Sequence, residues 1–103
     1  MGKSFSLVPA PTFKADVRIP RPGEEDGIVT FQFAHKSIKE LAAIESLEGR
    51  SATDFLLEIV KGWALPDPFT PENLDVLQDN YPSATKAIIT TYYTELLGNR
   101  EKN

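Results

Sequence analysis

The sequence of 103 residues contains no cysteine, so disulfides and thiolate metal sites are excluded. It has a single histidine, His35, with no second histidine or Glu-x-x-His arrangement at metal-ligand spacing. No stretch approaches the roughly 20 consecutive apolar residues that a membrane-spanning helix needs, and no apolar core of a secretion signal follows Met1. The lack of cysteine fits a reducing cytoplasm, and we expect no metal or other cofactor and no action in a membrane.

A cluster of positive charge is also missing. The formal net charge is −4, and an acidic surface repels nucleic acid unless basic residues gather on it. The basic residues of the central region stand singly, at Lys36, Lys39, Arg50, Lys61 and Lys86. Nucleic-acid binding is therefore disfavoured.

Catalytic constellations are absent as well. Serine catalysis needs a nucleophile presented with a base, whereas Ser37, Ser51 and Ser83 stand where helix caps are expected. No Gly-x-Ser-x-Gly motif or phosphate-binding glycine loop occurs. The acidic run 24–26 lacks the ligand register of an EF-hand. The sequence thus predicts a protein without enzymatic activity, which works by binding other proteins.

Two segments near the N-terminus show the two-residue period of half-buried strands. Phe13, Ala15, Val17 and Ile19 alternate with polar residues, and 29–33 repeats the pattern with aromatic and β-branched side chains. Residues 20–27 between them are rich in turn-forming proline, glycine and acidic residues. The pair is predicted to form an antiparallel β-hairpin whose apolar face must pack on other elements.

The rest of the chain predicts about four helices. Ser37 and Ser51 begin capping boxes, with Gly49 ending the first helix and the apolar stripe of the second continuing to Trp63. Thr70 begins a third helix that ends before Pro82, and a fourth runs from Ser83 to about Leu97. We therefore predict an α+β fold, a two-stranded antiparallel hairpin packed on about four helices. Residues 1–11 are expected to be a flexible arm, 12–98 a single domain and 99–103 a polar tail.

The last helix carries more apolar surface than one face requires. Ile88 and Tyr92 belong to one stripe, while Ile89, Tyr93 and Leu97 form an adjacent one. Such a helix is either buried on two sides, which we favour, or exposes one stripe to a partner. The candidate partner-binding residues are Trp63, Ile89, Tyr92, Tyr93 and Leu97.

Several short motifs in the second half of the chain resemble those of a known family. They are Val60-Lys61-Gly62-Trp63, Pro68-Phe69-Thr70, Glu72-Asn73-Leu74, Tyr81-Pro82, Ala87-Ile88 and Tyr92. The sequence from about Phe13 to Leu97 resembles the tail assembly chaperones of long-tailed bacteriophages and prophages. These motifs include no catalytic residues and assign no partner contact to a particular residue.

The resemblance implies a protein of the host bacterial cytoplasm that acts in virion morphogenesis and is absent from the mature virion. Such chaperones bind the tape measure protein and help recruit tail tube subunits, and relatives can self-associate. In this family a longer product often arises by ribosomal frameshifting, and residues 101–103 are compatible with a slippery codon run. Two other hypotheses remain open: a small structural tail or head-completion protein, and a small regulatory protein that binds a host enzyme.

Overall fold

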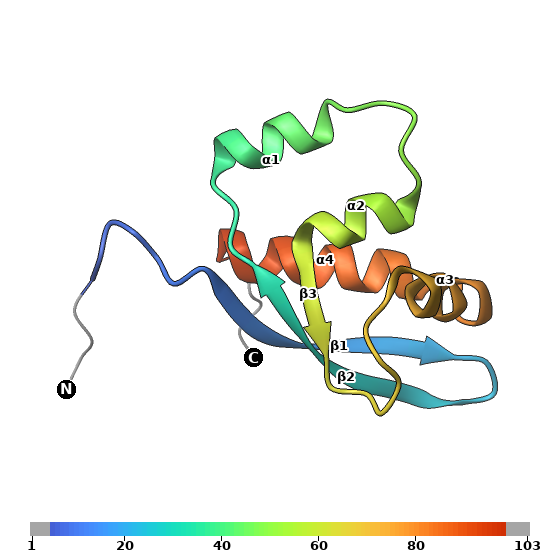
Figure 1. Cartoon of the computed structure of the whole chain (residues 1–103). Helices are drawn as coiled ribbons and strands as arrows, with labels where there is room; N and C mark the ends of the chain where they lie inside the picture. The colour runs from blue at the N-terminus through green and yellow to red at the C-terminus, as the bar shows by residue number, and fades with distance from the viewer. Residues whose placement is uncertain (1–4, 99–103) are drawn as a thin grey trace.

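The computed structural model describes residues 5–98 and has the predicted α+β architecture. A sheet with the strand order β1-β2-β3 packs on helices (Figure 1). It has three strands, one more than the sequence predicted. The elements are β1 (Thr12–Arg21), β2 (Glu24–Ala34), α1 (Ile38–Glu45), α2 (Ala52–Ile59), β3 (Val60–Trp63), α3 (Pro71–Asn80) and α4 (Ala84–Leu97).

The β1-β2 hairpin has the predicted inward face but a much shorter turn. Val17 and Phe31 are completely buried, as the alternation predicted. The expected turn over 20–27 is wrong, because both strands continue until Arg21 pairs with Glu24. The turn between them contains Gly23 at φ +72°, a left-handed conformation that glycine adopts without steric cost.

The third strand replaces the end of a predicted helix. The apolar stripe of α2 was expected to continue to Trp63, but the helix ends at Ile59. The next four residues pair antiparallel with β2, placing Trp63 opposite Phe31 and Val60 opposite Phe33. Pairing with the outer edge of β2 satisfies backbone groups there and buries Val60.

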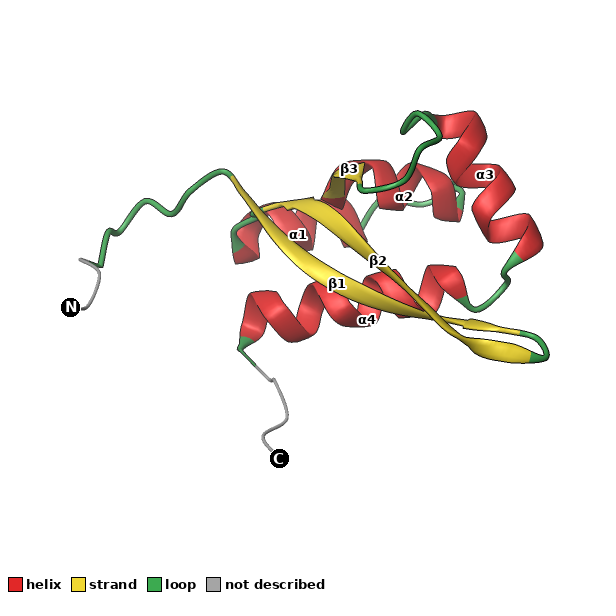
Figure 2. Cartoon of the chain, turned by 90° about the horizontal axis from the view of Figure 1, so that it is seen from below, coloured by secondary structure: helices red, strands yellow, loops and turns green. Residues whose placement is uncertain are grey.

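The helices gather around the inner face of the sheet and leave the other face open (Figure 2). Helix α4 packs along β1, and α2 contacts α3, α4 and both β2 and β3. Residues that are almost completely buried form one core, to which every helix and strand contributes at least one side chain. They are Val17, Ile19, Phe31, Phe33, Leu41, Leu56, Ile59, Val60, Leu74, Ala84, Ile88 and Tyr92.

Side-chain caps define the predicted helix starts. Ser37 and Ser51 form complete capping boxes, and the Thr70 hydroxyl accepts a hydrogen bond from the Asn73 backbone N–H. Ser83 occupies the predicted N-cap of α4 but makes no side-chain capping bond. Helix α1 ends at Glu45, before the predicted stop at Gly49.

Residues 5–11 precede the first strand and form neither helix nor strand. Their side chains are exposed. At the other end, Gly98 closes α4 at φ +73°. The predicted tail at 99–103 and the start of the predicted arm at 1–4 lie outside the described residues, so this division of the chain stays a prediction.

Candidate partner-binding surfaces

An apolar groove of about 400 Å³ runs between β2 and α3. We call it the β2-α3 groove. Two of its residues are large apolar side chains left more than half exposed, Ile28 at 57% and Val76 at 53%. The groove is lined mainly by Gly27, Ile28 and Val29 of β2, Trp63 of β3, and Val76 and Leu77 of α3.

Trp63 lies in this groove and is fixed by polar and aromatic contacts. Its indole Nε1 donates a hydrogen bond of 2.8 Å to the carbonyl oxygen of Asp67. Its ring meets Phe31 and Phe69 edge-on, with centroids 6.1 and 5.1 Å apart. Because these contacts hold the indole in one orientation, the groove presents a preformed aromatic surface.

A second groove of about 450 Å³ lies between α1, α2 and α4. We call it the α1-α4 groove. Ile89 and Tyr93 line it from α4, and the 55% exposed Leu47 lines it from the segment after α1. The Tyr93 hydroxyl donates a hydrogen bond to the Glu45 carboxylate. Burial and this hydrogen bond raise the pKa of Tyr93, so the phenol remains neutral over the physiological range.

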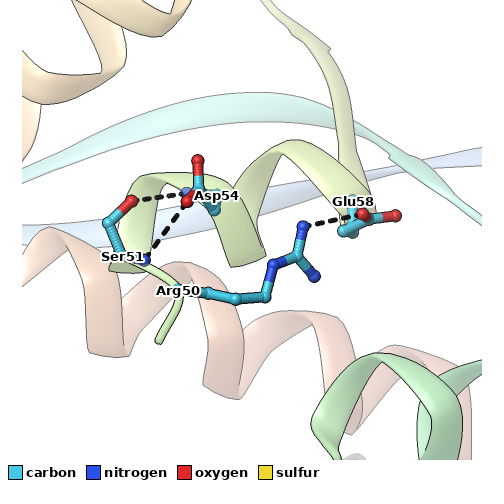
Figure 3. Close-up of polar contacts among 4 residues, drawn as sticks. All are labelled: Arg50, Ser51, Asp54 and Glu58. Atoms are coloured by element: carbon cyan, nitrogen blue, oxygen red, sulfur yellow. Dashed lines mark hydrogen bonds and ion pairs between the residues drawn. The ribbon is translucent and has the colours of Figure 1, made fainter. Parts of the chain in front are cut away.

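Polar contacts at the start of α2 shape one wall of the α1-α4 groove (Figure 3). Arg50 Nη2 donates to Glu58 Oε2 at 2.9 Å, while Ser51 and Asp54 exchange the two bonds of the capping box. The second guanidinium nitrogen of Arg50, Nη1, is buried and has no hydrogen-bond partner within residues 5–98. The ion pair therefore neutralises the charge of this arginine but leaves one of its donors unsatisfied.

Tyr92, named with the candidate binding residues, forms part of the core. It is 0% exposed, and its hydroxyl donates a hydrogen bond of 2.9 Å to the Ala34 carbonyl oxygen. Its ring lies 5.3 Å from that of Phe33 and 5.9 Å from that of Phe13. Burial raises the pKa of Tyr92 to about 12. A partner cannot reach this side chain in the folded chain, and we do not carry it forward as a contact residue.

The five candidate residues thus occupy separate places. Trp63 lies in the β2-α3 groove, Ile89 and Tyr93 line the α1-α4 groove, and Leu97 is 53% exposed near the end of α4. Ile89 and Tyr93 of the second apolar stripe also pack against the core, although they are only partly buried. Helix α4 is therefore covered on two sides over most of its length, which is the alternative that we favoured from the sequence.

Sequence reasoning missed two apolar residues of the β2-α3 groove. Ile28 interrupts the alternation of β2, since it lies opposite Arg18 on the outer face of the hairpin. Val76 lies beside the apolar edge of α3 formed by Leu74 and Leu77 rather than on it. Each could have been found as an apolar residue at a position where its element predicts a polar one.

The titratable groups of the described chain form no evident reaction centre. The pKa of Glu40 is lowered by its hydrogen bond with the Ser37 backbone N–H, which is its role in the cap. Within residues 5–98 no group of three or more histidine, aspartate or glutamate side chains is placed to hold a metal ion. In the same residues, no helix has the length and apolar character needed to cross a bilayer.

The fold and its two apolar grooves define a small α+β protein with surfaces suited to binding other proteins. The family model described as phage tail assembly chaperone matches residues 1–103, the whole chain. The chain belongs to this family, whose role in assembly is non-catalytic, and this confirms the predicted family. Neither the curated proteins nor the solved structures contain a match to the chain.

Proposed function

We propose that this tail assembly chaperone binds the tape measure protein of its phage and helps recruit tail tube subunits to it. It acts in the cytoplasm of the host bacterium and is absent from the mature virion. The observation that carries the proposal is the match of the whole chain to the phage tail assembly chaperone family.

The surface of the chain supports this function. Two apolar grooves lie on different elements and have no lining residue in common. Apolar surface of this kind shields apolar segments of a partner, while the net charge of −4 opposes aggregation of the complex. We infer that Trp63, Ile89, Tyr93 and Leu97 contact the partners.

The first test is a pull-down from cells that co-express this chain with the neighbouring tail genes. We expect the tape measure protein to be recovered. The chain and any longer frameshifted product should each be used as bait, because either form could carry the binding activity. If neither form binds any segment of the tape measure protein, the proposal is wrong.

Mass spectrometry of purified virions separates a chaperone from a structural protein. A chaperone should be missing from the particles, whereas a structural tail or head-completion protein should be present at fixed stoichiometry. Recovery of a single host enzyme, with no tail protein, would instead indicate a regulatory role.

The contribution of α4 is tested with Leu97→Ser in the same pull-down. Leu97 is 53% exposed, so this change should leave the fold intact and lower recovery of tail proteins. Ile38→Ser is the matched control, because Ile38 is 77% exposed on α1. Equal recovery with both variants would remove Leu97 from the binding surface.

A further inference from the structure

The outer edge of β2 is only partly covered by β3. Strand β3 pairs with β2 from Phe31 to Phe33, and the last bond runs from Ala64 N–H to the Thr30 carbonyl oxygen. In the described chain, no strand pairs with this edge from Glu24 to Val29. Ile28 lies two residues from Thr30 and therefore directs its own N–H and C=O to the same edge.

The β2-α3 groove follows this uncovered edge. Gly27, Ile28 and Val29 are consecutive, and consecutive strand residues point to opposite faces of a sheet. Ile19 and Arg21 of β1 also line the groove, so it extends over the hairpin near its turn as well as along the uncovered edge of β2 at 27–29. Val76 and Leu77 of α3 form its opposite wall. A strand edge beside a helix is an arrangement to which an extended peptide can be added.

The rim of the groove is predominantly acidic. Glu72 and Asp79 are exposed and lie four residues before and three residues after Val76, which places them on its face of α3. Asp67 lines the groove itself. The acidic run 24–26 adjoins the other wall.

The basic side chains of this rim are few. Arg21 also lines the groove, but its guanidinium pairs with Glu24 at 3.2 Å and its Nε donates to the Glu25 carbonyl oxygen. Arg18 lies opposite Ile28 on the outer face. Acidic side chains therefore dominate the potential that an approaching segment meets.

We propose that the β2-α3 groove binds an extended, basic segment of the tape measure protein, which adds as a strand to the edge of β2. Its apolar side chains contact Trp63 and Val76, and its lysine or arginine residues face Glu72 and Asp79. A second copy of this chain is disfavoured as the occupant, because two acidic edges would repel each other. The assignment of the partner rests on the proposed function.

The test measures binding of labelled overlapping tape measure peptides to the purified full chain by fluorescence anisotropy. Peptides that combine apolar and basic residues should bind. Ile28→Thr retains the β-branched side chain of a strand and should lower affinity about five- to ten-fold through lost apolar contact. The matched Ile38→Thr variant changes an exposed isoleucine of α1 and should bind as the wild type does.

The charge of the rim is tested separately. The double variant Glu72→Lys, Asp79→Lys should lower affinity about ten-fold at low salt, and the difference should shrink as salt is added. Glu48→Lys is the control, because Glu48 is exposed and does not line the β2-α3 groove. Circular dichroism checks that every variant is folded.

Amide hydrogen exchange followed by NMR tests the added strand. The Ile28 N–H should exchange at least ten-fold more slowly in the complex, because it gains a hydrogen bond. Peptide binding that leaves this exchange rate unchanged overturns strand addition. If binding is insensitive to Ile28→Thr and to the charge reversal, the β2-α3 groove is not the binding site. The proposed function would be unaffected by that result.

Two further outcomes are distinguishable. If the wild-type chain binds no tape measure peptide and no intact tape measure protein, both the proposed function and this inference fail. If sedimentation shows a dimer that Ile28→Thr dissociates, the occupant of the groove is a second copy and the inference is overturned.

Discussion

Replacing Tyr92 by phenylalanine removes one hydroxyl from the centre of the core and leaves the rest of the packing intact. That hydroxyl is completely buried and donates to the Ala34 carbonyl oxygen at 2.9 Å. A buried hydrogen bond contributes about 1 kcal/mol, and an acceptor left without its donor adds a desolvation cost. We expect Tyr92→Phe to lower the free energy of unfolding by about 1–2 kcal/mol at neutral pH.

The same phenol makes stability depend on alkaline pH. Its pKa is about 12 in the folded chain, above the ordinary value of about 10 that applies in the unfolded chain. The stabilisation is therefore complete below pH of about 10. It declines as pH rises from about 10 to about 12, because the unfolded chain then releases the proton more readily. The loss approaches about 2–3 kcal/mol at the top of this range.

Urea unfolding at a series of pH values measures both effects. Wild type should lose about 1 kcal/mol more than Tyr92→Phe between pH of about 9 and about 11. Tyr93 also has a raised pKa, but its larger causes, burial and the hydrogen bond to Glu45, are present in both proteins. Tyr81→Phe is the control at neutral pH, since the Tyr81 hydroxyl makes no hydrogen bond to any described residue. If Tyr92→Phe and Tyr81→Phe are equally stable, the argument from the buried hydroxyl is refuted.

Four further changes test local features of the fold, each by the urea midpoint at neutral pH. Ser51→Ala breaks the capping box of α2 and should cost about 1 kcal/mol, whereas Ser83→Ala should cost less than about 0.5 kcal/mol because Ser83 makes no capping bond. Gly23→Ala should cost about 1 kcal/mol, since the residue has φ +72° and the added methyl would meet no atom within 4 Å. Leu56→Ala removes a completely buried side chain of α2 and should cost about 2–5 kcal/mol.

The parts of the fold that sequence predicted well depend on short-range interactions. Alternation places Val17 and Phe31 on one face whatever the rest of the chain does. The capping boxes of Ser37 and Ser51 connect residues only three apart. Such patterns can be recognised from the sequence because the interacting groups are close together along the chain.

The end of α2 was mispredicted because the conformation of residues 60–63 depends on pairing with β2, which is distant in the sequence. Val60 and Trp63 fit the helical stripe of the preceding residues, and a short apolar run is compatible with either structure. The outer edge of β2 determines that these residues form a strand, because Phe31 and Phe33 provide strand pairing and apolar contact there. No local pattern contains that information, so tertiary context prevailed over periodicity.

The two adjacent tyrosines of α4 show the same limit at the level of single side chains. Neighbouring helical residues point about 100° apart, so Tyr92 and Tyr93 could not both occupy the centre of the core. The rotation of α4 against β1 decides which one is buried. It places Tyr92 among the aromatic rings and Tyr93 at the α1-α4 groove.

The β2-α3 groove could not be predicted because Ile28 and Val76 are distant in the sequence and meet only in the fold. A side chain more than half exposed contributes little to folding, so Ile28 and Val76 are available for contact with a partner. We expect Ile28→Thr and Val76→Thr to change the free energy of unfolding by about 0.5 kcal/mol or less in urea titrations, while each lowers affinity for the bound segment. A loss of about 2 kcal/mol would show that these side chains serve the core. The surface would then be part of the folding unit rather than a site kept open for a partner.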